Sequence, residues 1–492
     1  MEFALASNGR SIALRHIPCP PPESFRRGII AAVRRGRRIA MLFGQKETPT
    51  RLWAVLADDA DGTLSISSTQ VHDRFPSLTP DCPQAHLFER EIWESFGILP
   101  EGHPWLKPVR YPRAAGRAIS SDTNYFSALG EEVHEVAVGP VHAGIIEPGH
   151  FRFQCHGETV LHLEIQLGYQ HRGAETLIEQ SPAPRAIVVA ESIAGDTSVG
   201  HALAHAELRE SLGRCVVSPM AAAIRGIALE LARVANHIGD LGALCTDVGF
   251  LPGAATMGRQ RGEFLNMLME LSGNRLGRGL VRPGGVLFDA PKTLIDRWLA
   301  KLKRADRDFE ESAELMFEAG SVQARFDETG RVSPRAAMDL GFVGPAARSC
   351  GIERDVRMDH PHGIYRFSYI PISSVSTGDV LARALVRRLE VSRSLEFVKS
   401  QLGSLSSLST ALRVPCADPE PGHLAVSLVE GWRGEIAHAA ITDDAGRLAR
   451  YKIKDPSHHN WTALALALRQ TPISDFPLCN KSFNLSYAGH DL

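Results

Sequence analysis

The chain has 492 residues, enough for two or three domains, and its 44% hydrophobic and 22% charged residues are usual for a soluble globular protein. A formal net charge of -2 gives no bulk electrostatic reason to expect a nucleic-acid partner. No apolar run approaches the roughly 18 residues that cross a bilayer, and the N-terminus lacks the basic start and apolar core of a signal peptide. Eight scattered cysteines without a C-x-x-C pair argue against a thiol-held metal or a disulfide framework, and fit a reducing cytosolic setting.

Residues 1–112 are predicted to form a small α+β domain. Three short β-type runs are separated by turn residues, at 39–43, 52–56 and 64–68. A helix is predicted to begin at Pro83 and to end at Gly97. Residues 113–135 are polar and rich in Ala, Gly and Ser, so we expect a linker there.

Residues 136–492 are predicted to form a mainly α-helical bundle with a peripheral antiparallel β-hairpin and meander, which makes the whole chain α+β. The hairpin covers 151–167 and turns at 156–158, and the meander covers 424–453. Helical spacing occurs in seven further segments: 174–180, 199–212, 219–244, 259–271, 294–319, 379–400 and 461–469. The remainder, to Leu492, is predicted to be an irregular tail.

The stretch 225–250 is predicted to be the central helix of this bundle. Apolar side chains recur every three or four residues, namely Ile227, Leu231, Val234, Ile238 and Leu241. Glu230, Arg233, His237 and Asp240 form a second stripe at the same spacing. A narrow line of acid, base and imidazole suggests a buried, paired seam, whereas the alternative is an ordinary solvated face.

Two histidines, His142 and His150, lie in a glycine-containing loop that precedes the hairpin. Such a pair is able to ligate a metal, to contact a ligand, or simply to be solvated. From the residues alone, the interpretation that both imidazoles are solvated is favoured.

Several motifs together resemble a known family. E-R-E-I-W-E-S-F-G-I and G-H-P-W-L are similar to the 30-kDa-type subunit of NADH:quinone oxidoreductase (complex I). G-P-V-H-A-G, G-Y-Q-H-R-G-A-E and L-E-L-A-R-V-A-N-H-I-G-D-L-G are similar to its 49-kDa-type subunit, which is homologous to the large subunit of nickel-iron hydrogenases. The fusion of both in one chain resembles the large subunits of formate hydrogenlyase and hydrogenase-4, and E-P-G-H-F-R-F favours the hydrogenase-4 branch.

The chain departs from that family where the metal would be bound. A nickel-iron centre needs four thiolates in two C-x-x-C pairs, and by the resemblance these positions fall on Ala194, Thr197, Ser457 and Asn460. Alanine cannot bind a metal, and hydroxyl and amide oxygens are poor ligands for a soft one. We therefore expect no metal, no nickel-iron centre and no hydrogen activation, and a C-terminal tail that is not trimmed. The neighbouring His458 and His459 are a weak metal candidate, because adjacent imidazoles usually point apart.

Complex I also lacks these thiols and holds a quinone headgroup in the corresponding cavity. By this resemblance the loop of His142 and His150 faces the cavity, and Asp247 is the family's buried acid, which pairs with a histidine. The tyrosine that complex I places near the headgroup has no counterpart in A-G-D-T-S-V-G-H. Asp196, Thr197 and His201 are the candidates for that space, and His201 joins His142, His150 and Asp247 as the predicted catalytic residues.

The resemblance implies a large subunit of a hydrogenase-4-like or complex I-like oxidoreductase. It would form a quinone-type or related redox cavity beside an iron–sulfur cluster in a small partner subunit, and it would bind no cofactor itself. Membrane antiporter-like and anchor subunits would be further partners, with this chain peripheral on the cytoplasmic side of the inner membrane. The alternatives are a non-catalytic scaffold of such a complex and an active nickel-iron hydrogenase, which the missing thiols disfavour.

Overall fold

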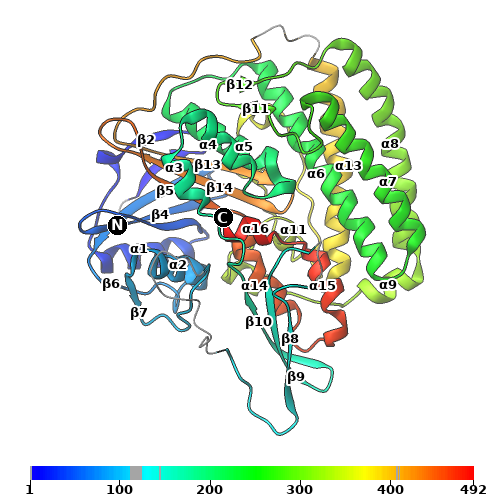
Figure 1. Cartoon of the computed structure of the whole chain (residues 1–492), viewed down its shortest axis with the longest axis horizontal. Coiled ribbons are helices and arrows are strands. Elements are labelled where there is room, and N and C mark those ends of the chain that lie inside the picture. The colour runs from blue at the N-terminus through cyan, green and yellow to red at the C-terminus, as the bar shows by residue number, and fades with distance from the viewer. Residues whose placement is uncertain (1–2, 111–124, 143–145, 406–407, 409–410) are drawn as a thin grey trace.

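The computed structural model describes residues 3–110, 125–142, 146–405, 408 and 411–492. Its elements form successive layers: two helices, two antiparallel sheets, a second group of helices, and a bundle of long helices (Figure 1). Within the described ranges, no helix is long and apolar enough to cross a membrane.

The N-terminal sheet has the strand order β1-β5-β4-β3, with all neighbours antiparallel. Its strands are β1 (Ala4–Ser7), β3 (Arg38–Gln45), β4 (Thr50–Asp58) and β5 (Thr63–Val71). β4 is buried on both faces, because Leu52, Ala54 and Leu56 point to one core and Trp53, Val55 and Ala57 point to another. The first core is covered by α1 (Pro22–Arg34) and α2 (His86–Phe96), and α2 ends at Gly97 in the left-handed conformation, as expected. β6 (Arg74–Pro76) and β7 (Leu99–Glu101) form a small parallel pair beside this sheet.

The second sheet contains the expected meander, but the meander is central rather than peripheral. Its strands are β13 (His423–Gly431), β14 (Gly434–Thr442) and β15 (Leu448–Lys454), in the order β15-β14-β13-β2. The fourth strand, β2 (Ser11–Ala13), comes from the N-terminal part of the chain. Every residue of β14 is buried, because one face packs on the N-terminal sheet and the other on helices. Alanine side chains on both faces of β14 let these layers approach.

Three helices cover the outer face of this sheet: α3 (Ala174–Gln180), α4 (Ala183–Glu191) and α5 (Ser198–Leu212). α4 was not predicted. The hairpin is present as β9 (His150–His156) and β10 (Thr159–Gln166), and β8 (Val133–Val138) pairs with β9. β8 begins inside the segment predicted as linker, while residues 111–124 of that segment lie outside the described ranges. The two predicted domains also share a sheet and a hydrophobic core.

The bundle consists of α6 (Pro219–Asp247), α7 (Leu251–Ser272), α8 (Lys292–Glu318) and α13 (Val380–Leu405), and α6 packs against both α7 and α13 (Figure 1). The apolar stripe predicted for α6 is buried throughout. Gly239 permits close packing, since a Cβ there would lie 2.9 Å from the Arg261 side chain of α7. Shorter elements connect the bundle to the sheets: β11 (Val281–Arg282), β12 (Gly285–Val286), α9 (Gly320–Phe326), α10 (Pro334–Asp339), α11 (Pro345–Arg348) and α12 (Val356–Asp359).

The helix predicted at 461–469 is present as α14 (Ser457–Ala467). The irregular tail predicted after it is wrong, because that segment forms α15 (Phe476–Phe483) and α16 (Tyr487–Asp491), and Leu492 is buried. These helices are too short to show a clear periodicity. They are instead fixed by tertiary contacts, such as the Leu492 carbonyl that accepts hydrogen bonds from the N–H groups of Arg172 and Gly173.

Candidate functional site

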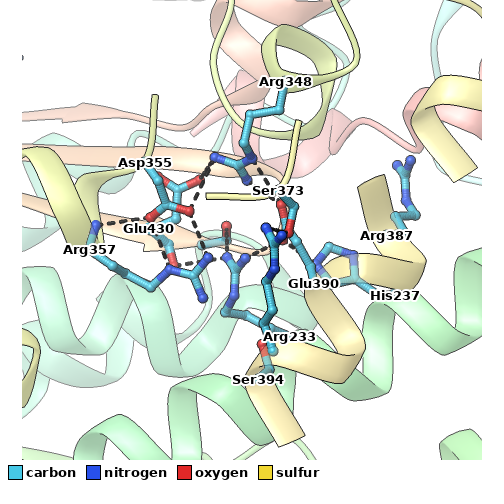
Figure 2. Close-up of polar contacts among 12 residues, drawn as sticks. Arg233, His237, Arg348, Asp355, Arg357, Ser373, Arg387, Glu390, Ser394 and Glu430 are labelled. Carbon is cyan, nitrogen blue, oxygen red and sulfur yellow. Dashed lines mark hydrogen bonds and ion pairs between the residues drawn. The ribbon is translucent and has the colours of Figure 1, made fainter. Parts of the chain in front are cut away.

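The polar stripe of α6 is a buried seam in which every member has a partner. Glu230 pairs with Arg357 at 3.0 Å, and Asp240 accepts a hydrogen bond from Arg387 at 2.8 Å. Arg233 forms a short ion pair with Glu390 of α13, whose carboxylate also lies 2.9 Å from His237 Nε2. Figure 2 shows Arg233 and His237 beside Glu390. The side chains of the seam are almost fully buried, so the paired seam is confirmed and the solvated face is excluded.

The seam belongs to a larger ion network with more acids than bases. Arg348 binds both Glu390 at 2.6 Å and Glu430 of β13 at 2.9 Å (Figure 2). The network holds four carboxylates, those of Glu230, Asp355, Glu390 and Glu430, against three guanidinium groups, those of Arg233, Arg348 and Arg357. Burial, together with the charge of Asp355, raises the pKa of Glu430 to about 7. The network joins α6, α13 and β13 and has a structural role.

The four positions onto which the family resemblance places the thiolates are occupied by side chains that pack or form hydrogen bonds within the protein. Ala194 is fully buried and has no donor atom. The Thr197 hydroxyl lies 3.0 Å from Asp196 and 3.3 Å from Arg433. Ser457 Oγ accepts a hydrogen bond from the Ser486 N–H at 2.9 Å. The Asn460 amide makes two hydrogen bonds with the backbone of Val343, at 3.2 and 3.0 Å. This donor set does not fit a nickel-iron centre.

Arg433 and the C-terminal helices fill the space around these positions. Arg433 forms a bidentate pair with Asp196, at 2.6 and 2.8 Å, and its Nε also donates to the Asn484 carbonyl. Burial alone would raise the pKa of Asp196, but the guanidinium outweighs it and lowers this pKa. A void of about 10 Å³ remains beside Arg433 and Asn460, with Ser482 and Phe483 in its wall. That volume suits about one water molecule.

The loop of His142 and His150 approaches this region without bringing either imidazole into the Asp196–Arg433 pair. His150 Nδ1 lies 3.3 Å from the Gly139 carbonyl, and a Cβ on Gly139 would lie 2.6 Å from His142 Nε2. Both ring nitrogens of His142 are buried, and burial lowers the pKa of His142 more than an interaction with the Gly149 backbone raises it. Glu147 of the same loop lies near the site, and its carboxylate interacts electrostatically with Arg433 and Asp196. Residues 143–145 lie outside the described ranges.

Asp247 is not the buried acid that was expected. It is the last residue of α6 and is exposed, and the charge that acts on it is that of Lys481 rather than that of a histidine. Partial desolvation raises the pKa of Asp247. The buried acid of the seam is instead Asp240, two turns earlier on the same helix, held by Arg387 and Asn484.

His201 lies at a buried junction that sequence reasoning found only in part. Its Nε2 is 3.1 Å from the Asp455 carboxylate, and its Nδ1 is 3.0 Å from His438 Nε2. Asp455 lies two residues before Ser457, but it was not predicted to be a site residue. His438 and Arg433 carry no local signal in the sequence, because they become neighbours of the site only through strand pairing.

The comparisons with known proteins identify the family on both parts of the chain. The family model described as "Respiratory-chain NADH dehydrogenase, 49 Kd subunit" matches residues 247–417, and that of the 30 Kd subunit matches residues 53–117. Formate hydrogenlyase subunit 5 of Escherichia coli (strain K12) is 29% identical over 90% of this chain and 80% of that protein. The carbon monoxide-induced hydrogenase of Rhodospirillum rubrum is 30% identical over 71% of this chain and 97% of that protein. The chain belongs to this family of complex I-like large subunits.

A solved structure supports the fold assignment for the same family. A chain of the membrane-bound sulfane sulfur reductase (MBS), an archaeal respiratory membrane complex, aligns with a TM-score of 0.67 and 24% identity. The alignment covers 74% of this protein and 100% of that chain. The protein is therefore a fused large subunit of the hydrogenase-4 and complex I type, with the α+β fold of that family.

Proposed function

We propose that this chain forms a redox pocket without its own metal, beside an iron–sulfur cluster carried by a small partner subunit. The electron acceptor would be a quinone or a related molecule that takes up two electrons and two protons. In this proposal the complex includes membrane antiporter-like and anchor subunits, with this chain peripheral on the cytoplasmic side and electron transfer coupled to ion movement.

One observation supports this proposal: the four residues that the resemblance assigns to thiolate positions carry no sulfur, and their polar atoms form hydrogen bonds within the protein. What surrounds them is suited to hydrogen bonding and proton exchange. Asp196 and Arg433 lie beside Thr197, while His201 and Asp455 lie beside Ser457. A paired imidazole and carboxylate are suitable groups for delivering protons to a reduced oxygen.

A second candidate is a non-catalytic scaffold. It is favoured by the packing of the C-terminal helices against the same positions, which leaves only about 10 Å³ beside Arg433 and Asn460. A scaffold of this kind would retain the fold to join other subunits and would need no open pocket.

The test uses the purified complex, its nickel content and the reoxidation of its reduced iron–sulfur cluster. We expect no stoichiometric nickel, and we expect a soluble quinone analogue to reoxidise the dithionite-reduced cluster, as followed by electron paramagnetic resonance. Asp196→Asn removes the charge that holds Arg433 and should slow reoxidation at least about tenfold. Asp306→Asn is the control, since Asp306 pairs with Lys399 on the partly exposed surface of α8.

The outcomes separate the alternatives. Nickel at one atom per complex would refute the proposal and establish a hydrogenase-type centre. A reduced cluster that the quinone analogue does not reoxidise, in an intact complex, would favour the scaffold. Equal reoxidation rates in Asp196→Asn and Asp306→Asn would show that the Asp196–Arg433 pair takes no part in the redox reaction.

A further inference from the structure

Five buried side chains form one continuous series of hydrogen bonds through the middle of the molecule. From Asp455, which follows β15, the series passes through His201, His438 and Tyr451 to His205, which lies one turn after His201 on α5. The four donor–acceptor distances are 3.1, 3.0, 2.8 and 2.9 Å in that order. Each side chain is at most 1% exposed.

The position of every proton in this series follows from its first member. Burial would raise the pKa of Asp455, but hydrogen bonds from His201 and the Ser457 N–H, together with the charges of His201 and Arg433, lower it, so Asp455 is an ionised acceptor. With a single proton on its ring, His201 carries that proton on Nε2 towards Asp455, which leaves its Nδ1 to accept from His438 Nε2–H. His438 Nδ1 is then an acceptor for the Tyr451 hydroxyl. The Tyr451 oxygen in turn accepts from His205 Nδ1–H.

This arrangement leaves a lone pair, rather than an N–H group, on His205 Nε2. That nitrogen is buried and has no hydrogen-bond partner among the described residues. Burial lowers the pKa of His205 to about 3, and it lowers that of His438 well below its usual range, so both rings are neutral. All hydrogen bonds of the series therefore point the same way, from His205 towards Asp455.

We propose that these five side chains are a proton relay that ends at the pocket. A proton that binds His205 Nε2 releases the Nδ1 proton to the Tyr451 oxygen, and the Tyr451 hydroxyl proton passes to His438 Nδ1. His438 then gives its Nε2 proton to His201 Nδ1, and His201 gives its Nε2 proton to the Asp455 carboxylate. One proton enters, one is held as the carboxylic acid of Asp455, and every hydrogen bond has reversed its direction.

The charged groups around the series are consistent with proton movement between its two ends. At the His205 end, Arg209 is partly exposed, and its charge acts on His205 and Tyr451, while Glu175 acts on Tyr451 and His438. At the other end, Arg433 acts on Asp455, and Asp455 acts in turn on Asp196. Asp455 also packs closely under α16, where a Cβ on Gly489 would lie 2.6 Å from its carboxylate. The relay thus joins the partly exposed Arg209 side to the Asp196–Arg433 pair, and its use as a proton supply rests on the proposed function.

The matched variants are Tyr451→Phe and Tyr365→Phe. Each removes one buried hydroxyl, and Tyr365 donates at 2.7 Å to Glu230 of the ion network, away from the relay. In the intact complex, Tyr451→Phe should slow cluster reoxidation by the quinone analogue at least about tenfold and should increase the solvent deuterium isotope effect. Tyr365→Phe should keep both the wild-type rate and the wild-type isotope effect.

A second measurement needs neither turnover nor a variant of the relay hydroxyl. Nitrogen NMR of the full chain with labelled histidine reports which ring nitrogen carries the proton, with assignments from single His→Gln variants. We expect His205 as the Nδ1–H form, and His201 and His438 as the Nε2–H form. Other tautomers, or a protonated His205, would overturn the relay.

The results that would overturn the relay differ from the result that would refute the proposed function. A wild-type rate and isotope effect in Tyr451→Phe would overturn the relay while the redox pocket stands. An equal slowing in Tyr365→Phe would assign the loss to packing and would also overturn it. A wild-type complex without quinone-dependent reoxidation would refute the proposed function, and the tautomers would then decide whether the relay exists.

Discussion

At the scale of single residues, Glu430 stands out because the ion network around it has one more carboxylate than guanidinium. The surplus is not relieved by solvent, since Glu430 is 1% exposed. Its pKa of about 7 means that the folded protein keeps a proton there which the unfolded chain, with an ordinary glutamate, has already lost. Stability from this group is fully present below about pH 4.5 and is lost as the pH rises through about 7.

We expect the free energy of unfolding to fall between about pH 5 and pH 7, with a contribution from Glu430 of up to roughly 1.4 kcal/mol per pH unit. Glu430→Gln should reduce this slope, because the amide does not titrate. Denaturant unfolding at several pH values measures it. Glu310→Gln, at a half-exposed pair with Arg388, is the control and should retain the wild-type slope. An unchanged slope in Glu430→Gln would assign the titration to another group.

At the scale of elements, α6 shows what periodicity can predict and what it cannot. The apolar stripe and the polar seam could both be predicted from the sequence, because a helix places residues three and four apart on one face. The partners of the seam could not be predicted, because Arg357, Arg387 and Glu390 lie more than 120 residues away in sequence. The same limit applies to the site: motifs assigned the expected thiolate positions, whereas Arg433 and His438 were brought in by strand pairing. The prediction that Asp247 is buried was wrong because α6 ends at the surface of the protein.

We expect Arg357→Met to destabilise the fold by about 3–5 kcal/mol, because it leaves the carboxylates of Glu230 and Asp355 buried with fewer cations. The double variant Arg357→Met/Glu230→Gln should recover part of that loss. Arg259→Met on α7 breaks an exposed pair with Glu263 and should cost less than about 1 kcal/mol. Chemical denaturation of the purified chain gives these differences, and equal losses for the two arginines would contradict a structural role for the network.

At the scale of the whole molecule, the two family-like parts are held together by more than the covalent connection. β2 adds a short strand to the edge of the second sheet, with Ile12 opposite Leu424. Arg38 of β3 pairs with Glu435 of β14 inside the shared core, where both side chains are almost fully buried. This interface could not be predicted from the sequence, since β2 has only three residues and Arg38 reads as an ordinary surface cation.

We expect fragments 1–117 and 118–492, produced together, to associate and to elute as one species in size-exclusion chromatography. Strand addition by β2 and the shared core provide the contacts that would hold the fragments together. In the intact chain the same contacts form within one molecule. Arg38→Met should weaken the association at least about tenfold, because it leaves Glu435 without one of its two cations. Arg74→Met, whose partners Asp73 and Glu101 lie within the first fragment, should have no effect. Separate elution of the unmutated fragments would refute this interface.

The packing of residues 482–486 over Arg433, Ser457 and Asn460 makes this segment a cover for the interior. Ser486 and Asn484 hold it in place by hydrogen bonds to Ser457 and Arg433, and Ser482 and Phe483 line the void that remains. A chain that stops before residue 482 would therefore expose these polar groups to solvent.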